Sequence, residues 1–120
     1  MTIEDVDKVD KIVIERATGK AMLLISDHLP WDVDEDRHLE LLQTKVYRQL
    51  DGIESGELYQ RAPLTKGRQF AIVIYSLFEL SRDGRNLVNK LTPYLAGMGV
   101  ELRWIHFDPN AAADKPSSPN

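Results

Sequence analysis

The chain has 120 residues, of which 42% are hydrophobic, enough apolar material for one packed core. Its 15 basic and 19 acidic residues give a net charge of -4, which disfavours a general nucleic-acid surface because phosphates attract basic stripes. The absence of cysteine excludes disulfides, thiolate metal sites and cysteine nucleophiles. No apolar run reaches the roughly 20 residues that span a bilayer, and no secretory signal opens the chain, so we expect a cytoplasmic protein without membrane contact.

The first half of the chain predicts a β-hairpin followed by a helix. Residues 11–16 and 21–26 are short β-forming runs, and Gly19 between them can supply the positive φ of a turn. Asp32 and Glu35 have the spacing of a capping box, and an acidic run suits the start of a helix. Apolar residues then recur at three- and four-residue steps, which indicates one buried helix face.

The second half predicts a connection, a strand, a helix and a last strand. Residues 57–68 are polar and read as a connection, whereas residues 69–77 are apolar on both faces, as in an interior strand. Ser81 is the expected cap of a second helix, in which Pro93 should cause a kink or a fresh turn. Residues 100–107 alternate well enough to form the last strand. The inward positions of the second helix are expected at Leu87, Leu91, Leu95 and Met98.

This order, ββαβαβ, predicts an α+β fold in two layers. Both strand-helix-strand segments have the length of a right-handed crossover, so a four-stranded sheet should carry its two helices mainly on one face. Residues 1–108 are expected to form a single domain. Residues 109–120, rich in proline, serine and alanine, are expected to be a disordered polar tail.

Strand alternation places a second apolar set on the sheet face away from the helices. A contiguous apolar patch larger than a few hundred square ångströms usually marks an interface, so a second copy or a protein partner is expected there. The other interpretation is that the 57–68 connection and the N-terminal segment cover this face. The set comprises Val13, Met22, Leu24, Ala71, Val73, Tyr75, Ile105 and Phe107.

The densest group of reactive side chains is Ser-Asp-His-Leu-Pro-Trp at residues 26–31, between the second strand and the first helix. In an enzymatic interpretation Asp27 orients His28, which acts as a base or binds a ligand, with His38 assisting. In a structural interpretation Asp27 bonds loop amides and Trp31 caps the core. Both remain open from the sequence.

Ligand types for a metal are present, but a metal motif is not. Three histidines accompany the acidic run, yet no His-Glu-x-x-His pattern occurs. Asp32, Asp34 and Asp36 imitate the start of a calcium loop, but Arg37 replaces its turn glycine and Gln43 its final glutamate. No metal or other cofactor is therefore expected.

The same segment carries a resemblance to a family. The chain resembles small, mostly bacterial proteins of uncharacterised function that share an Ile-Ser-Asp-His-Leu-x-Trp segment, an acidic run and a leucine-rich helix. The resemblance extends over about residues 7–107 in element order, which agrees with one domain. It implies no activity, because none is established for the family. The matching pieces are residues 25–29, 31, 32–36, 38–39, 41–43 and 53–57.

Two functional hypotheses follow. The first is a small cytoplasmic binding or regulatory protein, such as an immunity or adaptor protein, that acts as a homodimer or with a protein partner. The alternative is a small enzyme or metal-dependent hydrolase centred on Asp27, His28 and Trp31. The candidate binding residues are Trp31, Asp32, Glu35 and His38 near the loop, and Val73, Tyr75 and Phe107 on the sheet.

Overall fold

The computed structural model describes residues 11–106. Phe107, the tail expected from residue 109 and the N-terminal segment expected as a cover lie outside the described residues. The elements are β1 (Lys11–Ile14), β2 (Ala21–Asp27), α1 (Glu35–Glu54), α2 (Glu57–Arg61), a short 3-10 helix η1 (Pro63–Thr65), β3 (Phe70–Ser76), α3 (Arg82–Ala96) and β4 (Val100–His106).

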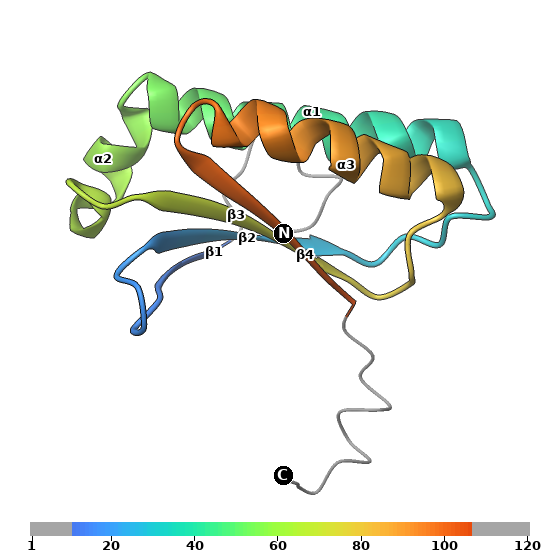
Figure 1. Ribbon diagram of the computed structural model, residues 1–120, viewed down its shortest axis with the longest axis horizontal. Helices are drawn as coiled ribbons and strands as arrows, with labels where there is room; N and C mark the ends of the chain where they lie inside the picture. Colours follow the sequence, from blue (N-terminus) through green and yellow to red (C-terminus); the bar gives the residue numbers. More distant parts are fainter. Residues whose placement is uncertain (1–10, 107–120) are drawn as a thin grey trace, which may run out of the picture.

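The four strands form one mixed sheet in the order β1-β2-β3-β4. β1 runs antiparallel to β2, as a hairpin does, whereas β2, β3 and β4 are parallel neighbours. Parallel neighbours require crossovers of fixed hand, which bring successive helices to the same side. Figure 1 shows α1 and α3 lying together over one face of the sheet. The α+β class is thus confirmed, and we call the face away from α1 and α3 the open face.

The core lies between the sheet and the helices. β3 is buried along its length apart from the partly exposed Tyr75, which confirms an interior strand. Its helix-facing residues meet apolar stripes on α1 and α3, and removing this apolar area from water is the main stabilising term. The fully buried members include Leu23, Ile25, Leu42, Val46, Ile72, Ile74 and Leu95.

The start of α1 differs from the expected capping box. Asp34, not Asp32, is the N-cap, and its carboxylate accepts the backbone N–H of Arg37 at 3.2 Å. The prediction was wrong by two residues because the acidic run offers several residues able to cap. Which of them caps depends on the path of the loop from β2, and this path is a tertiary property.

The connection between α1 and β3 is partly helical. Residues 57–68, expected to lack regular structure, contain α2 and η1, and Leu58 of α2 is 2% exposed. Figure 1 places α2 at the end of the helical layer, beside α1. A single buried leucine on a five-residue helix is too short a pattern to predict from periodicity. α2 therefore leaves the open face uncovered.

α3 begins as expected and ends differently. Ser81 is its N-cap, with the hydroxyl accepting the N–H of Gly84 at 3.0 Å. The helix continues through Pro93 to Ala96, and the hydroxyl of Thr92 donates to the carbonyl of Val88 at 2.7 Å. Met98, expected to point inward, lies after the helix and is 39% exposed.

Candidate functional site

The candidate site lies where the three parallel strands end. Asp27, Ser76 and His106 stand in register at the ends of β2, β3 and β4. α1 and α3 start from this same edge, because each follows one of these strands. Ligands of open parallel sheets bind outside the carboxyl ends of the strands, so this edge is the first place to look for chemistry.

Asp27 and His38 form a buried pair at this edge. Nε2 of His38 lies 2.8 Å from Oδ1 and 2.6 Å from Oδ2 of Asp27, and both residues are 1% exposed. Oδ1 also accepts the backbone N–H of Leu29 at 3.2 Å. When the ring is neutral, Nε2–H donates to the carboxylate and Nδ1 keeps its lone pair. The carboxylate thus sets the tautomer and the orientation of the ring.

Trp31 completes the cluster by contacting both helices. Its indole stacks on the ring of His38, with centroids 3.5 Å apart and planes inclined by 15°. On α3, a Cβ atom at Gly84 would lie only 2.8 Å from Cη2 of Trp31. A side chain at Gly84 would therefore collide with the indole, so the close packing of α3 on this loop depends on glycine.

Two polar atoms of the cluster are buried without a partner. Within residues 11–106, neither Nδ1 of His38 nor Nε1 of Trp31 makes a hydrogen bond. A pocket of about 80 Å³, lined by His38 together with Pro30 and Val33, adjoins the ring. Most buried polar groups in proteins are bonded to protein or to water, so an unbonded Nδ1 beside a pocket indicates where water or a small ligand would bind.

The predicted site residues divide into two groups. Asp27 and Trp31 belong to the cluster, whereas His28 is exposed on the loop, as is Asp32. Glu35 is partly exposed in the first turn of α1. The residue that meets Asp27 is His38, which the sequence interpretation gave only an assisting role. The available signal was its spacing of four residues before the buried Leu42, which places His38 on the inward face of α1.

Among residues 11–106, no group of three or more histidine, aspartate or glutamate side chains is arranged to hold a metal ion. The exposed Asp32, Asp34 and Asp36 precede or begin α1, where carboxylates interact well with the helix dipole. The only cap bond found for this run comes from Asp34 among the described residues.

A second arrangement of charged residues lies on the open face, in the row that the sequence interpretation described only as apolar. Arg103 donates from Nη1 and Nη2 to the carboxylate of Glu15 at 2.9 and 3.1 Å, and from Nε to Glu101 at 2.9 Å. Lys20 donates to Glu101 at 2.8 Å. We call Glu15, Lys20, Glu101 and Arg103 the charged network; its two positive and two negative charges balance.

The network covers part of the sheet and shifts the acidity of its members. Nη1 of Arg103 also approaches Sδ of Met22 at 3.6 Å, spanning Ala71, which is fully buried on the strand between them. Hydrogen bonds from Arg103 lower the pKa of both Glu15 and Glu101 to about 2. The same contacts raise the pKa of Arg103.

Comparison with known proteins identifies the family. A family of unknown function (DUF6572) matches residues 1–108, so the chain belongs to it. No curated protein and no solved structure matches the chain. In the described part of the chain, none of the helices combines the length and the apolar character needed to cross a membrane.

Proposed function

We propose that this protein is a small cytoplasmic binding or regulatory protein that acts through a protein–protein interface on the open face. The supporting observation is that Tyr75 and Ile105 are neighbours in register, are both partly exposed, and lie where α1, α2 and α3 give no cover. The partly exposed Leu24 lies beside Val73, which is 1% exposed. An apolar centre bordered by charged side chains is the usual anatomy of an interface.

The chemistry of the face favours a partner protein with an apolar patch flanked by basic groups. The chain carries a net charge of -4, and the exposed acidic run at 32–36 adds negative charge at the carboxyl ends of the strands. Opposite charge on a partner speeds association and selects against acidic competitors. The charged network is internally balanced, so the contribution of the open face itself is mainly apolar.

Site-specific photocrosslinking in the source cell tests this proposal. A photoreactive phenylalanine analogue replaces Tyr75 on the open face or, as the matched control, Tyr94 on α3, which is 53% exposed. We expect a discrete protein adduct from position 75 and none of the same mass from position 94. Equal adducts at both positions, or none at 75, would contradict an interface on the open face.

A second candidate function, a small hydrolase, is favoured by the buried pair. Asp27 holds Nε2–H of His38, so Nδ1 can take a proton from a water molecule in the adjoining pocket. Trp31, stacked on the ring, restricts its rotation. The sequence hypothesis centred this chemistry on Asp27, His28 and Trp31; the geometry supports His38 as the base instead.

Turnover of a panel of model esters, amides and phosphate esters tests the hydrolase. If His38 is the base, His38→Asn abolishes activity at neutral pH, whereas His28→Asn, on the exposed part of the loop, retains it. Asp27→Asn should lower kcat more than KM is raised, because it disturbs the tautomer and not substrate contact. A wild-type protein without turnover on the panel, or equal losses in both histidine variants, would reject this candidate.

A further inference from the structure

β4 is an edge strand whose outer backbone is unpaired among the described residues. It pairs with β3 along Val100–His106, and no strand within residues 11–106 pairs with its other edge. The strand has seven residues and contains no proline. Edge strands of this kind are templates for pairing with another strand unless charge, proline or a bulge prevents it.

The side chains of β4 are self-complementary when two copies run antiparallel. If Leu102 meets Leu102 of a second copy, then Glu101 stands opposite Arg103 and Val100 opposite Trp104. Each pair thus joins opposite charges or two apolar groups, which are the favourable cross-strand combinations. The charged pairs lie on the open face and the apolar pairs on the helix side, as their burial requires.

Neighbouring registers lack this match. A shift that places Arg103 opposite its own copy, or Glu101 opposite its own copy, brings like charges together on a sheet surface. A shift by one residue turns the helix side of one copy toward the open face of the other. The sequence Glu-Leu-Arg, centred on Leu102, therefore selects one arrangement around a two-fold axis.

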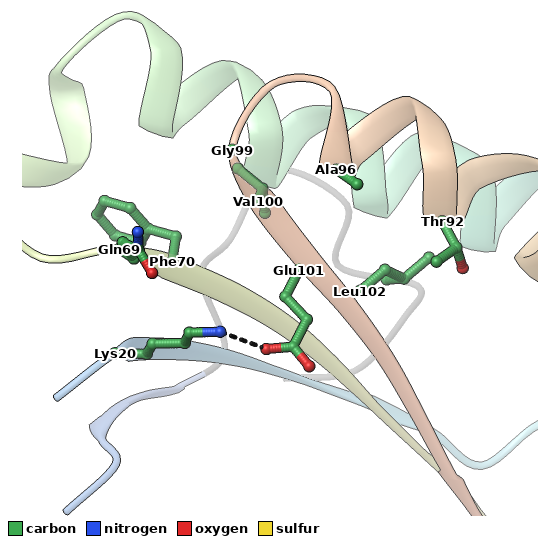
Figure 2. Close-up of a pocket in the computed structure, with 9 residues that line it drawn as sticks. All are labelled: Lys20, Gln69, Phe70, Thr92, Ala96, Gly99, Val100, Glu101 and Leu102. Carbon is green, nitrogen blue, oxygen red and sulfur yellow. Dashed lines mark hydrogen bonds and ion pairs between the residues drawn. The ribbon is translucent and has the colours of Figure 1, made fainter. Parts of the chain in front are cut away.

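The surroundings of the edge leave room for the second strand. A hollow of about 260 Å³ opens at the amino-terminal end of β3 and β4, and Thr92, Ala96, Val100 and Leu102 line it on the helix side. Figure 2 shows Leu102 close to Thr92, while Glu101 turns the other way to meet Lys20. The partner's Trp104, which stands opposite Val100 in this register, can enter the hollow.

We propose that the protein forms a two-fold symmetric dimer by antiparallel pairing of β4 with β4 of a second copy, centred on Leu102. The pairing joins two four-stranded sheets into one of eight strands. Both open faces then lie on the same side and form one continuous surface. The dimer does not depend on the open face binding a partner, and it leaves that face free to do so.

Oxidative crosslinking of single cysteines tests the register. The natural chain has no cysteine, so Leu102→Cys introduces the only thiol. Directly opposed residues in antiparallel strands have Cα atoms about 4.5–5.5 Å apart, within the range that a disulfide spans. We expect rapid formation of a covalent dimer by Leu102→Cys. Ile105→Cys on the same strand and Tyr94→Cys on α3 are more exposed controls and should remain largely monomeric. Equal crosslinking at all three positions would overturn the register.

Sedimentation equilibrium of the full chain tests the association independently of cysteine. At micromolar concentration we expect a single dimer; a monomer, or an open series of larger species built head to tail through β1, overturns the proposal. Glu101→Arg places two arginines opposite each other and should weaken the dimer about tenfold or more. Adding Arg103→Glu restores the complementary pair and should recover most of the affinity, whereas failure of this double variant to recover would also count against the proposal.

A matched control separates the interface from the charged network. Lys20→Met removes one intrachain ion pair of Glu101 but lies on the β2 side of the sheet, away from the β4 edge. Its dimer affinity should stay close to that of the wild type. Loss of photocrosslinking at Tyr75 with an intact dimer would reject only the proposed function, and the reverse result would reject only the dimer.

Discussion

At the residue scale, the buried Asp27–His38 pair concentrates the strongest polar contacts of the molecule in one place. Two short contacts join Nε2 to the carboxylate, while Nδ1 on the other side of the ring has no partner within residues 11–106. A buried carboxylate depends on its partner, because removing that partner leaves a charge without compensation. The pair therefore stabilises the fold regardless of whether it also carries out chemistry.

We predict that His38→Leu lowers the free energy of unfolding by about 3–5 kcal/mol, the usual cost of breaking a buried pair. His28→Leu, at an exposed position ten residues earlier, should change it by only about 0.5 kcal/mol. Urea denaturation at neutral pH measures both. Similar losses in the two variants would show that the Asp27–His38 contact contributes little.

The charged network predicts a specific acid dependence of stability. The folded-state pKa values of Glu15 and Glu101, about 2, lie below the ordinary value of 4.5, so their contribution is complete above pH 4.5. As the pH falls from 4.5 toward 2, protonation removes it. Arg103→Met should therefore flatten the loss of stability over this window, as followed by urea midpoints at several pH values. An unchanged slope in the variant would mean that the network does not couple to folding.

At the element scale, two glycines inside helices play opposite roles. Gly84 lies in the first turn of α3, where a Cβ would come within 3.0 Å of Cζ2 and 2.8 Å of Cη2 of Trp31. Gly52 lies near the end of α1, where nothing stands within 4 Å of an added Cβ. The first is required by packing of the loop against α3, and the second only weakens its helix.

Alanine at these two positions should change stability with opposite signs. We predict that Gly84→Ala lowers the free energy of unfolding by about 1–3 kcal/mol, because the added methyl group displaces Trp31. Gly52→Ala should raise it by about 0.4–1 kcal/mol, because alanine restricts the unfolded chain and favours helix. Thermal and urea unfolding of both variants measure these changes. If both variants are stabilised, Trp31 does not pack closely against α3.

At the scale of the whole molecule, the sheet has helices on one face and two edges of different length. β1 has four residues whereas β4 has seven. The longer edge carries the self-complementary charges and the apolar residues of the proposed dimer. Dimerisation would bury the outer backbone of β4, leaving β1 as the edge of the enlarged sheet.

Because a dimer dissociates on unfolding, its thermal midpoint depends on concentration. We predict that the midpoint of the wild-type protein rises as the protein concentration is increased through the micromolar range. Glu101→Arg, which opposes like charges across the axis, should show a midpoint nearly independent of concentration. Calorimetry at several concentrations provides the measurement, and a wild-type midpoint that does not move would argue for a monomer.

Several elements were predictable because their signals are local. β3 is apolar on both faces, which places it in the interior of a sheet, and Ser81 precedes a helical pattern at the distance of a cap. The leucine stripe of α1 identified the buried face from Leu42 onward. The Asp34 cap and α2 were missed because an acidic run and a five-residue helix contain too little periodicity to resolve.

The candidate site was predictable only in part. The loop with Asp27 and Trp31 stood out by composition, but the choice of His38 over His28 as the ring beside the carboxylate depends on how the loop leads into α1. Likewise, Glu101 and Arg103 followed from alternation, but their contacts with Glu15 and Lys20 join residues more than eighty positions apart. Such distances along the chain cannot be inferred from spacing.

The sequence by itself determined the α+β class, the interior strand and the polar row that ends the strands, because periodicity and side-chain chemistry act over a few neighbouring residues. Tertiary structure alone decided which imidazole meets Asp27, which carboxylate caps α1 and how the charged network closes over Ala71. The physical reason is that these contacts need backbone segments to approach in space, and their geometry depends on the whole packed sheet and its crossovers.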